Sequence, residues 1–468
     1  MLWVDIDTHA QTSIVHQLCE QLRLKILKGD LNPGEMLPPS RVLAKQLNIS
    51  RNSVIYSYEQ LIAEQFLEAR KGAGTFVACG AYLERYKDYV KEEANQKSNR
   101  PVRNEQDIID FRDGIPDLKN APKKIWAKLL RDVCLDATEE SYDYGDPFGK
   151  MELRSSISKY VLKRKGIRCS AEQVVILSGS AQGFSIIAKV LNLRNKEIIV
   201  EDPSYRGIKT IFDHFNVVFN AISVDSKGIK TEFLNRYEKS KLMIITPSHH
   251  YPLGGVLPIQ RRIQLIQFAR KNEIYIIEND YDNEFRYSGP ALQSLHLLDP
   301  DYVIHLATFS LTLFPSLRMG YMILPERLMP RCYEIMYANS LEASTMKQLA
   351  LSRFISEGHI DRHINKMRKN YYKKQQLLID QLMQAFGNKI KIYGASTGMY
   401  LVAEFKDILF SAELVEALSK NGVKFELVED HTFKKGVHQN KIILGYGNLQ
   451  LDEIEKGVER LQKWLNAM

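Results

Sequence analysis

Residues able to hold a small anionic ligand follow short apolar runs in the C-terminal three quarters of the chain. Residues 178–182 come directly after one such run and are mostly small residues that enter a helical pattern. The backbone amides and the helix dipole at such a turn can hold a phosphate group. Polar and aromatic segments follow three further runs, at residues 201–206, 246–254 and 278–285. Because functional residues of a parallel sheet lie at the carboxyl ends of its strands, these segments predict a ligand site at one edge of a sheet.

Histidine and cysteine residues do not add a metal site to this prediction. His249 and His250 are adjacent but have no further ligands at suitable spacing, so a structural or pocket-lining role is expected and no metal is predicted. The five cysteines are scattered, odd in number and without a CxxC pair, which argues against a disulfide framework and a zinc site. We expect them to be reduced and buried or half-buried.

The elements that position the ligand segments are short strands separated by helical patterns. From Phe111 to the C-terminus, apolar runs of four residues alternate with longer segments of helical periodicity, which is typical of a largely parallel, buried sheet. The expected strands are residues 174–177, 197–200, 242–245, 274–277 and 302–305.

The N-terminal 78 residues have a different pattern. Residues 11–28 carry apolar residues at four-residue spacing and predict an amphipathic helix closed by Gly29. A second helix is expected with Ser40 as its N-cap, and a third with Ser50 as its N-cap. Residues 66–77 then predict a hairpin with glycines at its tip. This order of elements matches a winged helix-turn-helix. The recognition helix of such a motif, here the third helix, enters the major groove of DNA.

The polar residues of this segment fit a DNA contact surface. Arginine can contact guanine and asparagine adenine, while serine hydroxyls and helix N-terminal amides can hold phosphates. Residues 38–58 contain three basic residues and no acid, although residues 1–78 as a whole are neutral. The predicted DNA-binding residues are Arg41, Ser50, Arg51, Asn52, Ser53, Tyr56, Arg70, Lys71 and Gly72.

The overall composition is consistent with a soluble, multidomain protein. The chain has 468 residues, a hydrophobic fraction of 44% and a net charge of +8, which by itself is weak support for a polyanionic partner. It has no apolar run long enough for a membrane span and no signal peptide, so a cytoplasmic protein is expected. Residues 79–107 are polar and mixed in charge and predict a linker, with a helical start at residues 82–90. The expected domains are therefore 1–78, 79–107 and 108–468.

The whole chain resembles the MocR subfamily of GntR-family bacterial regulators, in which a winged helix-turn-helix is fused to an α/β fold-type I aminotransferase-like domain. The resemblance rests on residues 11–78 and on the ordered segments of the large domain, including Phe309-Ser310 and Pro315-Ser316-Leu317-Arg318. It implies a mainly parallel sheet with a smaller C-terminal α+β subdomain, and head-to-tail dimers that bind double-stranded operator DNA. It also implies a site for pyridoxal phosphate, in which Tyr205 stacks on the ring, Tyr281 bonds the phenolic oxygen and Arg318 holds the phosphate. The cofactor-site residues expected are Ser178, Gly179, Ser180, Ala181, Gln182, Tyr205, Arg206, Asn279, Tyr281, Ser310 and Arg318.

Three departures from the subfamily bear on this site. Leu311 stands where the resemblance places the Schiff-base lysine, and residues 301–330 contain no lysine at all. Asn279 stands where an aspartate would keep the pyridine nitrogen protonated, with Asp280 as a candidate substitute. Residues 428–433 offer no arginine to clamp an amino-acid carboxylate. Because a Schiff base requires a lysine amine, covalent attachment of pyridoxal phosphate is not expected.

The prediction from sequence is a DNA-binding transcriptional regulator that senses a small-molecule effector through a catalytically inactive aminotransferase-like domain. Three interpretations of the pocket stay open: non-covalent pyridoxal phosphate, a different small molecule, or a ligand-free dimerisation scaffold. Sensing is preferred to a pure scaffold because the phosphate and ring-stacking residues occur together. An active aminotransferase with a DNA-binding head, and a dimeric DNA-binding protein without a ligand, are the alternatives.

Overall fold

The chain divides into two compact units, Met1–Asn104 and Glu105–Met468. The computed structural model describes residues 4–8, 10–81, 108–289, 292–339 and 342–466. The division falls inside the predicted linker, most of which, with its predicted helical start, lies outside the described residues. The exact domain boundaries therefore stay a prediction, and the two units are treated separately below.

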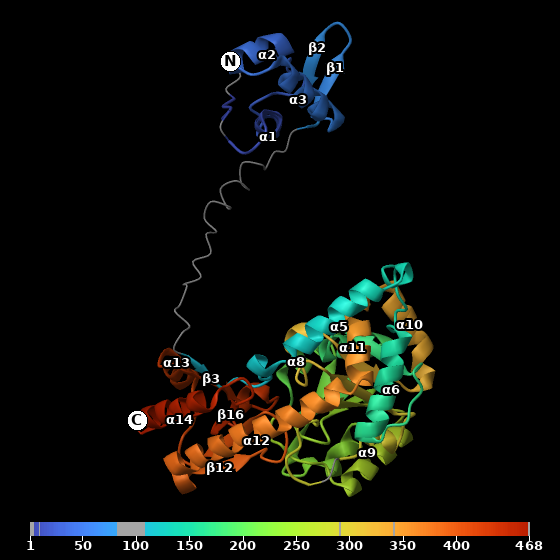
Figure 1. Cartoon of the computed structure of the whole chain (residues 1–468), viewed down its shortest axis with the longest axis vertical. Helices are drawn as coiled ribbons and strands as arrows, with labels where there is room; N and C mark the ends of the chain where they lie inside the picture. Colours follow the sequence, from blue (N-terminus) through green and yellow to red (C-terminus); the bar gives the residue numbers. More distant parts are fainter. Residues whose placement is uncertain (1–3, 9, 82–107, 290–291, 340–341, 467–468) are drawn as a thin grey trace. The chain divides into compact units, whose positions relative to one another are not determined.

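The first unit consists of three helices followed by a two-stranded hairpin (Figure 1). Its elements are α1 (Ile14–Leu27), α2 (Ser40–Leu47), α3 (Arg51–Ala63), β1 (Leu67–Arg70) and β2 (Gly74–Val77), and the two strands are antiparallel. The predicted apolar stripe of α1 is buried, together with Cys19, against residues of α2, α3 and the hairpin. The winged helix-turn-helix arrangement of elements is therefore present.

Of the three helix ends predicted from the sequence of this unit, two are confirmed. Gly29, with a φ of 74°, follows the last turn of α1, and the Ser50 side chain accepts the N–H of Ser53 at the start of α3. Ser40 was wrongly predicted as the N-cap of α2. Pro39 takes that place, because its extended backbone precedes the first helical residue, which is Ser40 itself. α2 thus begins without a side-chain cap.

The second unit is built on an eight-stranded sheet in the order β4-β11-β10-β9-β8-β5-β6-β7. Pairing is parallel from β10 through β9, β8 and β5 to β6, and antiparallel at both ends of the sheet. All five strands expected from apolar runs are present, so the mainly parallel sheet is confirmed. The strands are β4 (Val174–Leu177), β5 (Glu197–Asp202), β6 (Val218–Asp225), β7 (Gly228–Ile229), β8 (Leu242–Ile245), β9 (Tyr275–Asp280), β10 (Val303–Thr308) and β11 (Gly320–Ile323).

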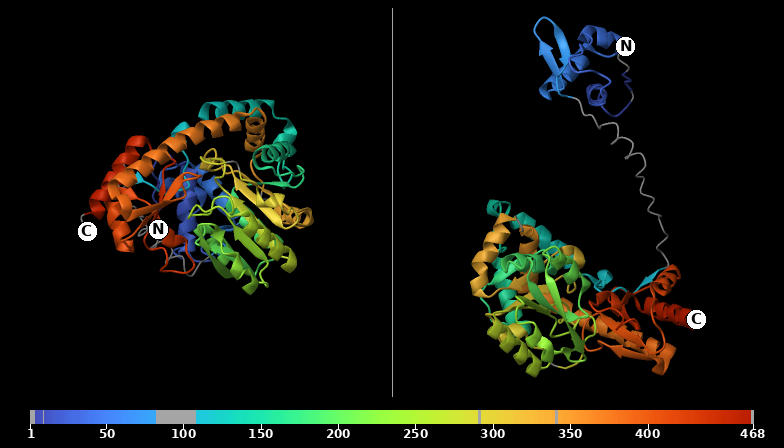
Figure 2. Two further views of the ribbon diagram at one scale, coloured as in Figure 1. Left: turned by 90° about the horizontal axis from the view of Figure 1, so that it is seen from below. Right: turned by 180° about the vertical axis from the view of Figure 1, so that it is seen from behind.

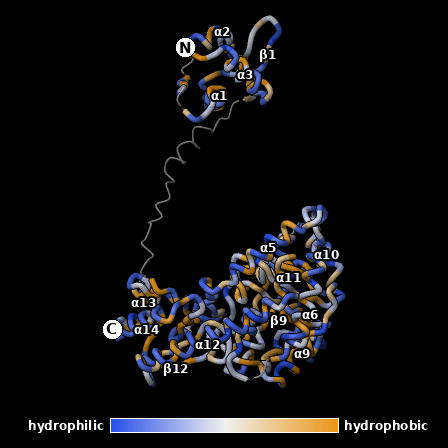
Figure 3. Tube along the Cα trace, in the orientation of Figure 1, coloured by the Kyte–Doolittle hydropathy of each residue, from blue (hydrophilic) through white to orange (hydrophobic). Residues whose placement is uncertain are grey.

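Helices cover both faces of this sheet (Figure 2). Alternate residues of β4 point to opposite faces of the sheet. Val175 and Leu177 belong to an apolar cluster with α7, α8 and α10. Val174 and Ile176 belong to a second cluster with α6, α11 and α12. α9 packs over a third cluster with Ile276. Hydrophilic and hydrophobic residues alternate along outer helices such as α5 and α6 (Figure 3). The helices are α5 (Lys123–Asp136), α6 (Met151–Lys165), α7 (Ser180–Val190), α8 (Arg206–Asp213), α9 (Ile259–Asn272), α10 (Met329–Ala338) and α11 (Thr345–Ser356).

A smaller sheet forms the C-terminal part of the second unit, which confirms the predicted α+β subdomain. It has the order β12-β13-β16-β15 and packs with α12, α13 and α14. The 28-residue helix α12 (His359–Phe386) runs from the large sheet to β12 (Figure 1). The other elements are β12 (Ile390–Tyr393), β13 (Tyr400–Phe405), α13 (Ala412–Lys420), β15 (Glu426–Leu427), β16 (Lys441–Gly445) and α14 (Leu451–Leu465).

A separate two-stranded parallel ladder joins the start of this unit to its C-terminal part. β3 (Ile109–Asp110) pairs with β14 (Val423–Lys424). The N–H groups of Ile109 and Phe111 donate to the carbonyls of Gly422 and Lys424, at 2.8 and 2.7 Å. The segment that follows β3 is thereby fixed beside β15, which begins at Glu426.

The expected burial of the five cysteines holds for three of them. Cys19 and Cys332 are buried and Cys169 is half-buried, but Cys79 and Cys134 are exposed, so the expectation of burial was wrong for these two. Cys134 lies on a helix face that the apolar cluster does not cover. Across the described ranges, no helix is long and apolar enough to cross a bilayer.

Candidate functional sites

The predicted DNA-binding residues of α3 occupy its exposed N-terminal part. Arg51 and Asn52 are exposed in the first turn, and Tyr56 is 63% exposed one turn later. The hydroxyls of Ser50 and Ser53 lie 2.9 Å apart and bond each other at the cap. Arg41, on α2, is also exposed. The first turn of α3 therefore presents one cationic and one amide side chain beside a bonded serine pair.

The hairpin places the remaining predicted DNA-binding residues at its tip. Lys71 and Gly72 are exposed, and Gly72 has a φ of 77°, a conformation that glycine adopts easily. The Arg70 guanidinium lies 4.3 Å from the centroid of Phe76 and is paired with Glu68. Arg70 is therefore held against the hairpin. Lys71 is exposed at the tip and forms no ion pair with any described residue.

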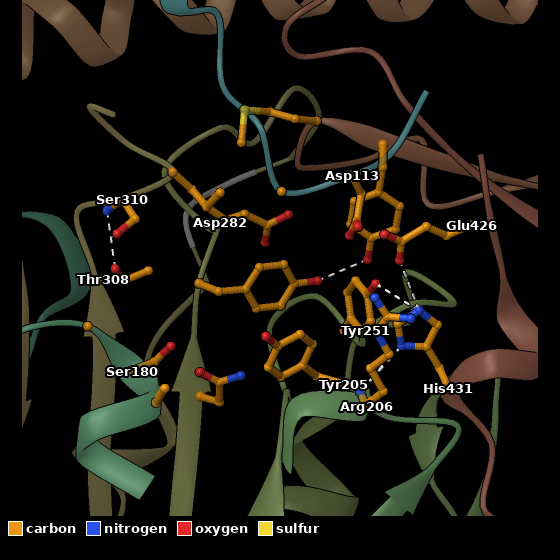
Figure 4. Close-up of a pocket in the computed structure, with 18 of the residues that line it drawn as sticks. Asp113, Ser180, Tyr205, Arg206, Tyr251, Asp282, Thr308, Ser310, Glu426 and His431 are labelled. Carbon is orange, nitrogen blue, oxygen red and sulfur yellow. Dashed lines mark hydrogen bonds and ion pairs between the residues drawn. The ribbon is translucent and has the colours of Figure 1, made fainter. Parts of the chain in front are cut away.

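The second unit contains a cavity of about 390 Å³ at the carboxyl ends of β4, β5, β9 and β10 (Figure 4). All the predicted cofactor-site residues line it except Ser178 and Gln182. These two bond each other, with the Ser178 N–H donating to Gln182 Oε1 at 2.5 Å. The lining residues are Asp113, Gly114, Gly179, Ser180, Ala181, Tyr205, Arg206, Tyr251, Asn279, Tyr281, Asp282, Thr308, Ser310, Leu311, Arg318, Met399, Tyr400, Glu426 and His431.

One end of the cavity has the features of a phosphate site. It lies at the N-terminus of α7, whose first turn has no side-chain cap. A Cβ atom on Gly179 would lie 3.1 Å from Nη2 of Arg318, so the absence of a side chain at 179 lets the guanidinium approach the helix end. Ser180 and Ser310 line the same region, and the N–H of Ser310 donates to Thr308 Oγ1 at 3.1 Å. Helix N-terminal amides with an arginine form a favourable site for a phosphate.

The middle of the cavity is lined by Asn279 and aromatic rings. The Tyr281 hydroxyl bonds the Tyr400 hydroxyl at 2.9 Å and donates to the His249 carbonyl at 3.2 Å. Burial raises the pKa of Tyr281 well above its ordinary value, and the charge of Asp282 adds to the effect. Tyr205 is 45% exposed and its ring lies edge-to-face with Tyr251, with centroids 6.1 Å apart. Tyr205 therefore lies at the solvent side of the cavity.

Asp280 does not substitute for Asn279. Its carboxylate pairs with the Lys165 ammonium and it does not line the cavity. Successive side chains of a strand point to opposite faces, so the residue after Asn279 in β9 faces away from the ligand space. β9 thus offers the cavity the neutral amide of Asn279 and not the Asp280 carboxylate, so the proposed substitution by Asp280 was wrong.

Lys165 is the centre of a buried polar cluster behind the cavity. The side chain is 4% exposed, and its Nζ lies 3.0 Å from Glu284 Oε1 in addition to its contact with Asp280. Tyr160 donates to Glu284 at 3.1 Å, and His305 Nε2 lies 3.8 Å from Asp280. Burial alone would lower the pKa of Lys165, but the charges of the two carboxylates outweigh burial and hold this pKa above its ordinary value. The ammonium therefore stays charged and compensates both acids.

Leu311 lines the cavity and packs against the main apolar cluster of the unit. The described lining of the cavity includes no lysine. His249 and His250 lie beneath it. His249 Nδ1 is 2.9 Å from Asp282 Oδ2, and burial, followed by the charge of His249, lowers the pKa of His250 to about 3. His250 is therefore neutral, and both histidines have the structural place that was expected for them.

The end of the cavity away from the phosphate site contains four residues that the sequence did not single out, Asp113, Met399, Tyr400 and Glu426. Tyr251 and Asp282 lie in the predicted ligand segments 246–254 and 278–285, and His431 lies in the segment 428–433, but none of the three was named as a site residue. Asp113 follows β3, and Glu426 belongs to β15. Both strands are two residues long, so no periodicity could predict them.

A buried glutamate at the end of β5 gives the second unit a pH-dependent stability. Burial raises the pKa of Glu201 to about 7, although the Thr246 N–H and hydroxyl donate to its Oε2 at 2.9 and 2.7 Å. The pKa in the folded state is above the ordinary value of 4.5, so this contribution to stability is complete below pH 4.5 and is lost as the pH rises through about 7.

Glu201→Gln should therefore gain stability relative to the parent chain as the pH rises. The expected gain is roughly 1.4 kcal/mol for each pH unit between the two pKa values, because the variant has no proton to lose. Urea unfolding of both proteins from about pH 4.5 to above pH 7 measures it. A difference that stays constant over this range would contradict the burial effect at Glu201.

The fold and the two sites together define a protein class, a winged helix-turn-helix joined to an aminotransferase-type domain. Residues 14–77 match the family "Bacterial regulatory proteins, gntR family", and residues 106–431 match "Aminotransferase class I and II". The second unit also resembles the kynurenine aminotransferase of Pyrococcus horikoshii, with a TM-score of 0.72 and 24% identity over 82% of this chain and 95% of that one. At this identity the likeness shows the fold.

Relatives with both parts share almost the whole length of the chain. It is 32% identical to the uncharacterized HTH-type transcriptional regulator YdeL of Bacillus subtilis (strain 168), over 96% of each chain. It is 31% identical to the probable rhizopine catabolism regulatory protein MocR of Rhizobium meliloti, over 99% of this chain and 96% of the relative. The chain belongs to the MocR type of GntR-family transcriptional regulators.

Proposed function

We propose that the protein is a transcriptional regulator that binds operator DNA through α3 and the hairpin. The observation that carries the proposal is the exposed first turn of α3, where Arg51 and Asn52 project from a capped helix end. A capped, solvent-exposed helix N-terminus with these side chains suits contact with base edges in the major groove. Lys71 at the hairpin tip supplies a cation for the DNA backbone.

The cavity serves as the effector site in this proposal. Its phosphate-binding end, its ring-lining residues and its size fit pyridoxal phosphate held without a covalent bond. Arg318, Ser180 and the amides of α7 would hold the phosphate, and Tyr281 would bond a ring oxygen. Bound pyridoxal phosphate ordinarily supplies an electron sink for reactions of amines. With Leu311 in the cavity instead of a lysine, and Asn279 in place of a carboxylate, the proposed role is sensing rather than turnover.

The regulator would act as a homodimer in the cytoplasm. Large apolar and aromatic side chains are exposed at the end of α5, in the loop after it and on α10. The N–H of Gly145 in this loop donates to Glu342, which follows α10 in the chain. Exposed apolar patches of this kind mark association surfaces. The residues are Leu135, Tyr142, Tyr144, Tyr333 and Tyr337, with Tyr144 92% exposed. A symmetric dimer would present two heads to a pseudo-palindromic operator.

Arg51→Ala tests the DNA-binding surface. An operator is first selected from a random DNA library with the full-length chain, and the affinity of parent and variant is then measured at one fixed salt concentration. We expect the variant to bind more weakly by about 1–3 kcal/mol, since it loses a base-directed guanidinium. Lys28→Ala, which removes a charge at the end of α1, is the matched control and should lose much less. Equal affinity of parent and Arg51→Ala would show that α3 is not the recognition helix.

A further inference from the structure

The acidic end of the cavity indicates what kind of ligand group it accepts. We propose that Asp113 and Glu426, together with the tyrosine rings beside them, bind the ammonium group of an amine ligand. The inference rests on the proposed role of the cavity as the effector site, and it specifies the chemistry of the end opposite the phosphate site. Figure 4 shows Asp113, Glu426, Tyr251 and His431 together at one end, with Ser180, Thr308 and Ser310 at the other.

The backbone fixes both carboxylates at this end. Asp113 lies two residues after Phe111, whose carbonyl accepts the N–H of Gly445 at 2.6 Å, and a Cβ on Gly445 would lie 2.7 Å from the Cα of Asp113. Glu426 is in β15, paired with Ile443 of β16. Glu426 therefore lies on a strand of the C-terminal part, and Asp113 lies in the segment after β3 that is held against β16 at Gly445.

His431 holds Glu426 in position at this end of the cavity. Its Nδ1 accepts the backbone N–H of Arg206 at 3.4 Å. Its Nε2 faces Glu426 Oε2 at 3.3 Å and the Tyr251 hydroxyl at 3.4 Å. The ring therefore contacts the carboxylate from one side and leaves the cavity side of Glu426 to a ligand.

The proximity of the two acids has an electrostatic cost that a cation would remove. Burial raises the pKa of Asp113 to about 6, the charge of Glu426 raises it further, and Asp282 acts in the same direction. Tyr251 and His431 act against this rise. Burial would raise the pKa of the facing Glu426, but the hydrogen bond and charge of His431, followed by the charges of Arg206 and Arg112, lower it. Asp282 is itself paired with His249. A ligand cation would favour the ionised form of Asp113 and thus bind most tightly above pH 6.

Aromatic rings complete the wall around this position. Tyr251 lies edge-to-face with Tyr205, Tyr281, Tyr400 and His431, with centroids 5.1 to 6.1 Å away. Tyrosine faces attract ammonium groups within about 6 Å of the ring. Rings and carboxylates together are the usual environment of a bound amine, whereas a carboxylate ligand would meet repulsion from both acids.

Among the described residues that line this end, Arg206 supplies the arginine side chain that would favour an anion. Its side chain is exposed at the rim, and no ion pair or side-chain hydrogen bond is recorded for its guanidinium within the described residues. Asp113 and Glu426 outnumber it, so the local charge stays negative with one cation at the rim. A ligand with a single carboxylate and no amine would have to overcome this excess.

Three compounds of equal chain length test the proposal: 1,5-diaminopentane, 5-aminopentanoate and pentanedioate. Binding to the full chain is measured by calorimetry at constant ionic strength. We expect the diamine to bind at least about tenfold more tightly than the dicarboxylate, a factor in the range of one partly buried charge pair. The affinity for the diamine should fall as the pH is lowered from 7 to 5, because Asp113 then takes up a proton. Asp113→Asn should reduce diamine affinity by about tenfold and abolish most of the pH dependence.

Tighter binding of pentanedioate, no measurable diamine binding, or diamine binding unchanged in Asp113→Asn would each overturn the proposal. Asp299→Asn, a change of a carboxylate paired with Arg270 and remote from the cavity lining, controls for general charge effects. Operator affinity without ligand is measured for the same variants. If Asp113→Asn keeps the operator affinity of the parent but loses diamine binding, the acidic end is assigned. If the diamine fails to bind while Arg51→Ala still loses operator affinity, the cation inference is wrong and the regulator proposal stands.

Discussion

Leu311→Lys should give the protein a visible Schiff-base absorption band on addition of pyridoxal phosphate, and the parent chain should give none. The residue lines the same cavity as Arg318 and Ser180, and it is partly buried against the apolar cluster. A lysine there would place an amine in a partly desolvated site near the Arg318 guanidinium, conditions that favour the neutral, nucleophilic form. The measurement is a spectrophotometric titration, followed by borohydride reduction and mass determination of the trapped adduct.

Leu311→Met is the matched control, because methionine has a similar length and no amine. It should bind pyridoxal phosphate as the parent does and trap nothing. A band in the parent chain would mean that a lysine elsewhere reaches the ligand, which would overturn the proposed sensing role. Absence of a band in Leu311→Lys, with non-covalent binding intact by calorimetry, would show that position 311 does not reach the aldehyde.

Lys165→Met should destabilise the second unit by about 3–5 kcal/mol, the range for removal of one partner from a buried ion pair. The substitution leaves Asp280 and Glu284 buried without their shared cation, and their side chains are 5% and 9% exposed. Chemical denaturation followed by circular dichroism measures the loss. Asp280 follows Asn279 in β9 but does not line the cavity. Lys165→Met should therefore lower the affinity for a ligand much less than it lowers the stability of the unit.

Lys163→Met provides the comparison from the same helix. Lys163 is 69% exposed and pairs with Asp361 at 2.6 Å, so the expected change is at most about 1 kcal/mol. The triple variant Lys165→Met, Asp280→Asn, Glu284→Gln should recover most of the stability, since no charge is then left uncompensated. Equal effects of the two single substitutions would refute the assigned role of the Lys165 cluster.

The sequence predicted the winged helix-turn-helix and the strands of the large sheet because their signals are local. The α3 stripe and the four-residue apolar runs each report burial through their own periodicity. The small residues at the N-terminus of α7 were assigned to a ligand site from an equally local pattern, a small-residue turn that enters a helix, and three of them line the cavity. Gly179, beneath Arg318, is the clearest case.

The acidic end of the cavity could not be predicted in the same way. Asp113 and Glu426 are separated by more than three hundred residues, and the short strands that bring them together are two residues long. The sequence also could not show that the Asp280 side chain points away from the cavity. Two adjacent polar residues at a strand end give no indication of which one faces the ligand. β11 begins two residues after Arg318, where the sequence was interpreted through its resemblance to a cofactor site, and it was not predicted. β6 was missed because it is mostly half-exposed.

The short ladder between β3 and β14 gives the chain a natural reporter of ligand occupancy. β3 is the first described element of the second unit, and the hydrogen bonds donated by Ile109 and Phe111 attach it only three residues before Asp113. A two-residue ladder opens at much lower free energy than a buried sheet, so its amides exchange with solvent through local opening. If the acidic end binds a ligand through Asp113, as proposed, we expect the closed ladder to be stabilised. Slower deuterium uptake at Ile109 and Phe111 would then record binding at the point where the chain enters this unit.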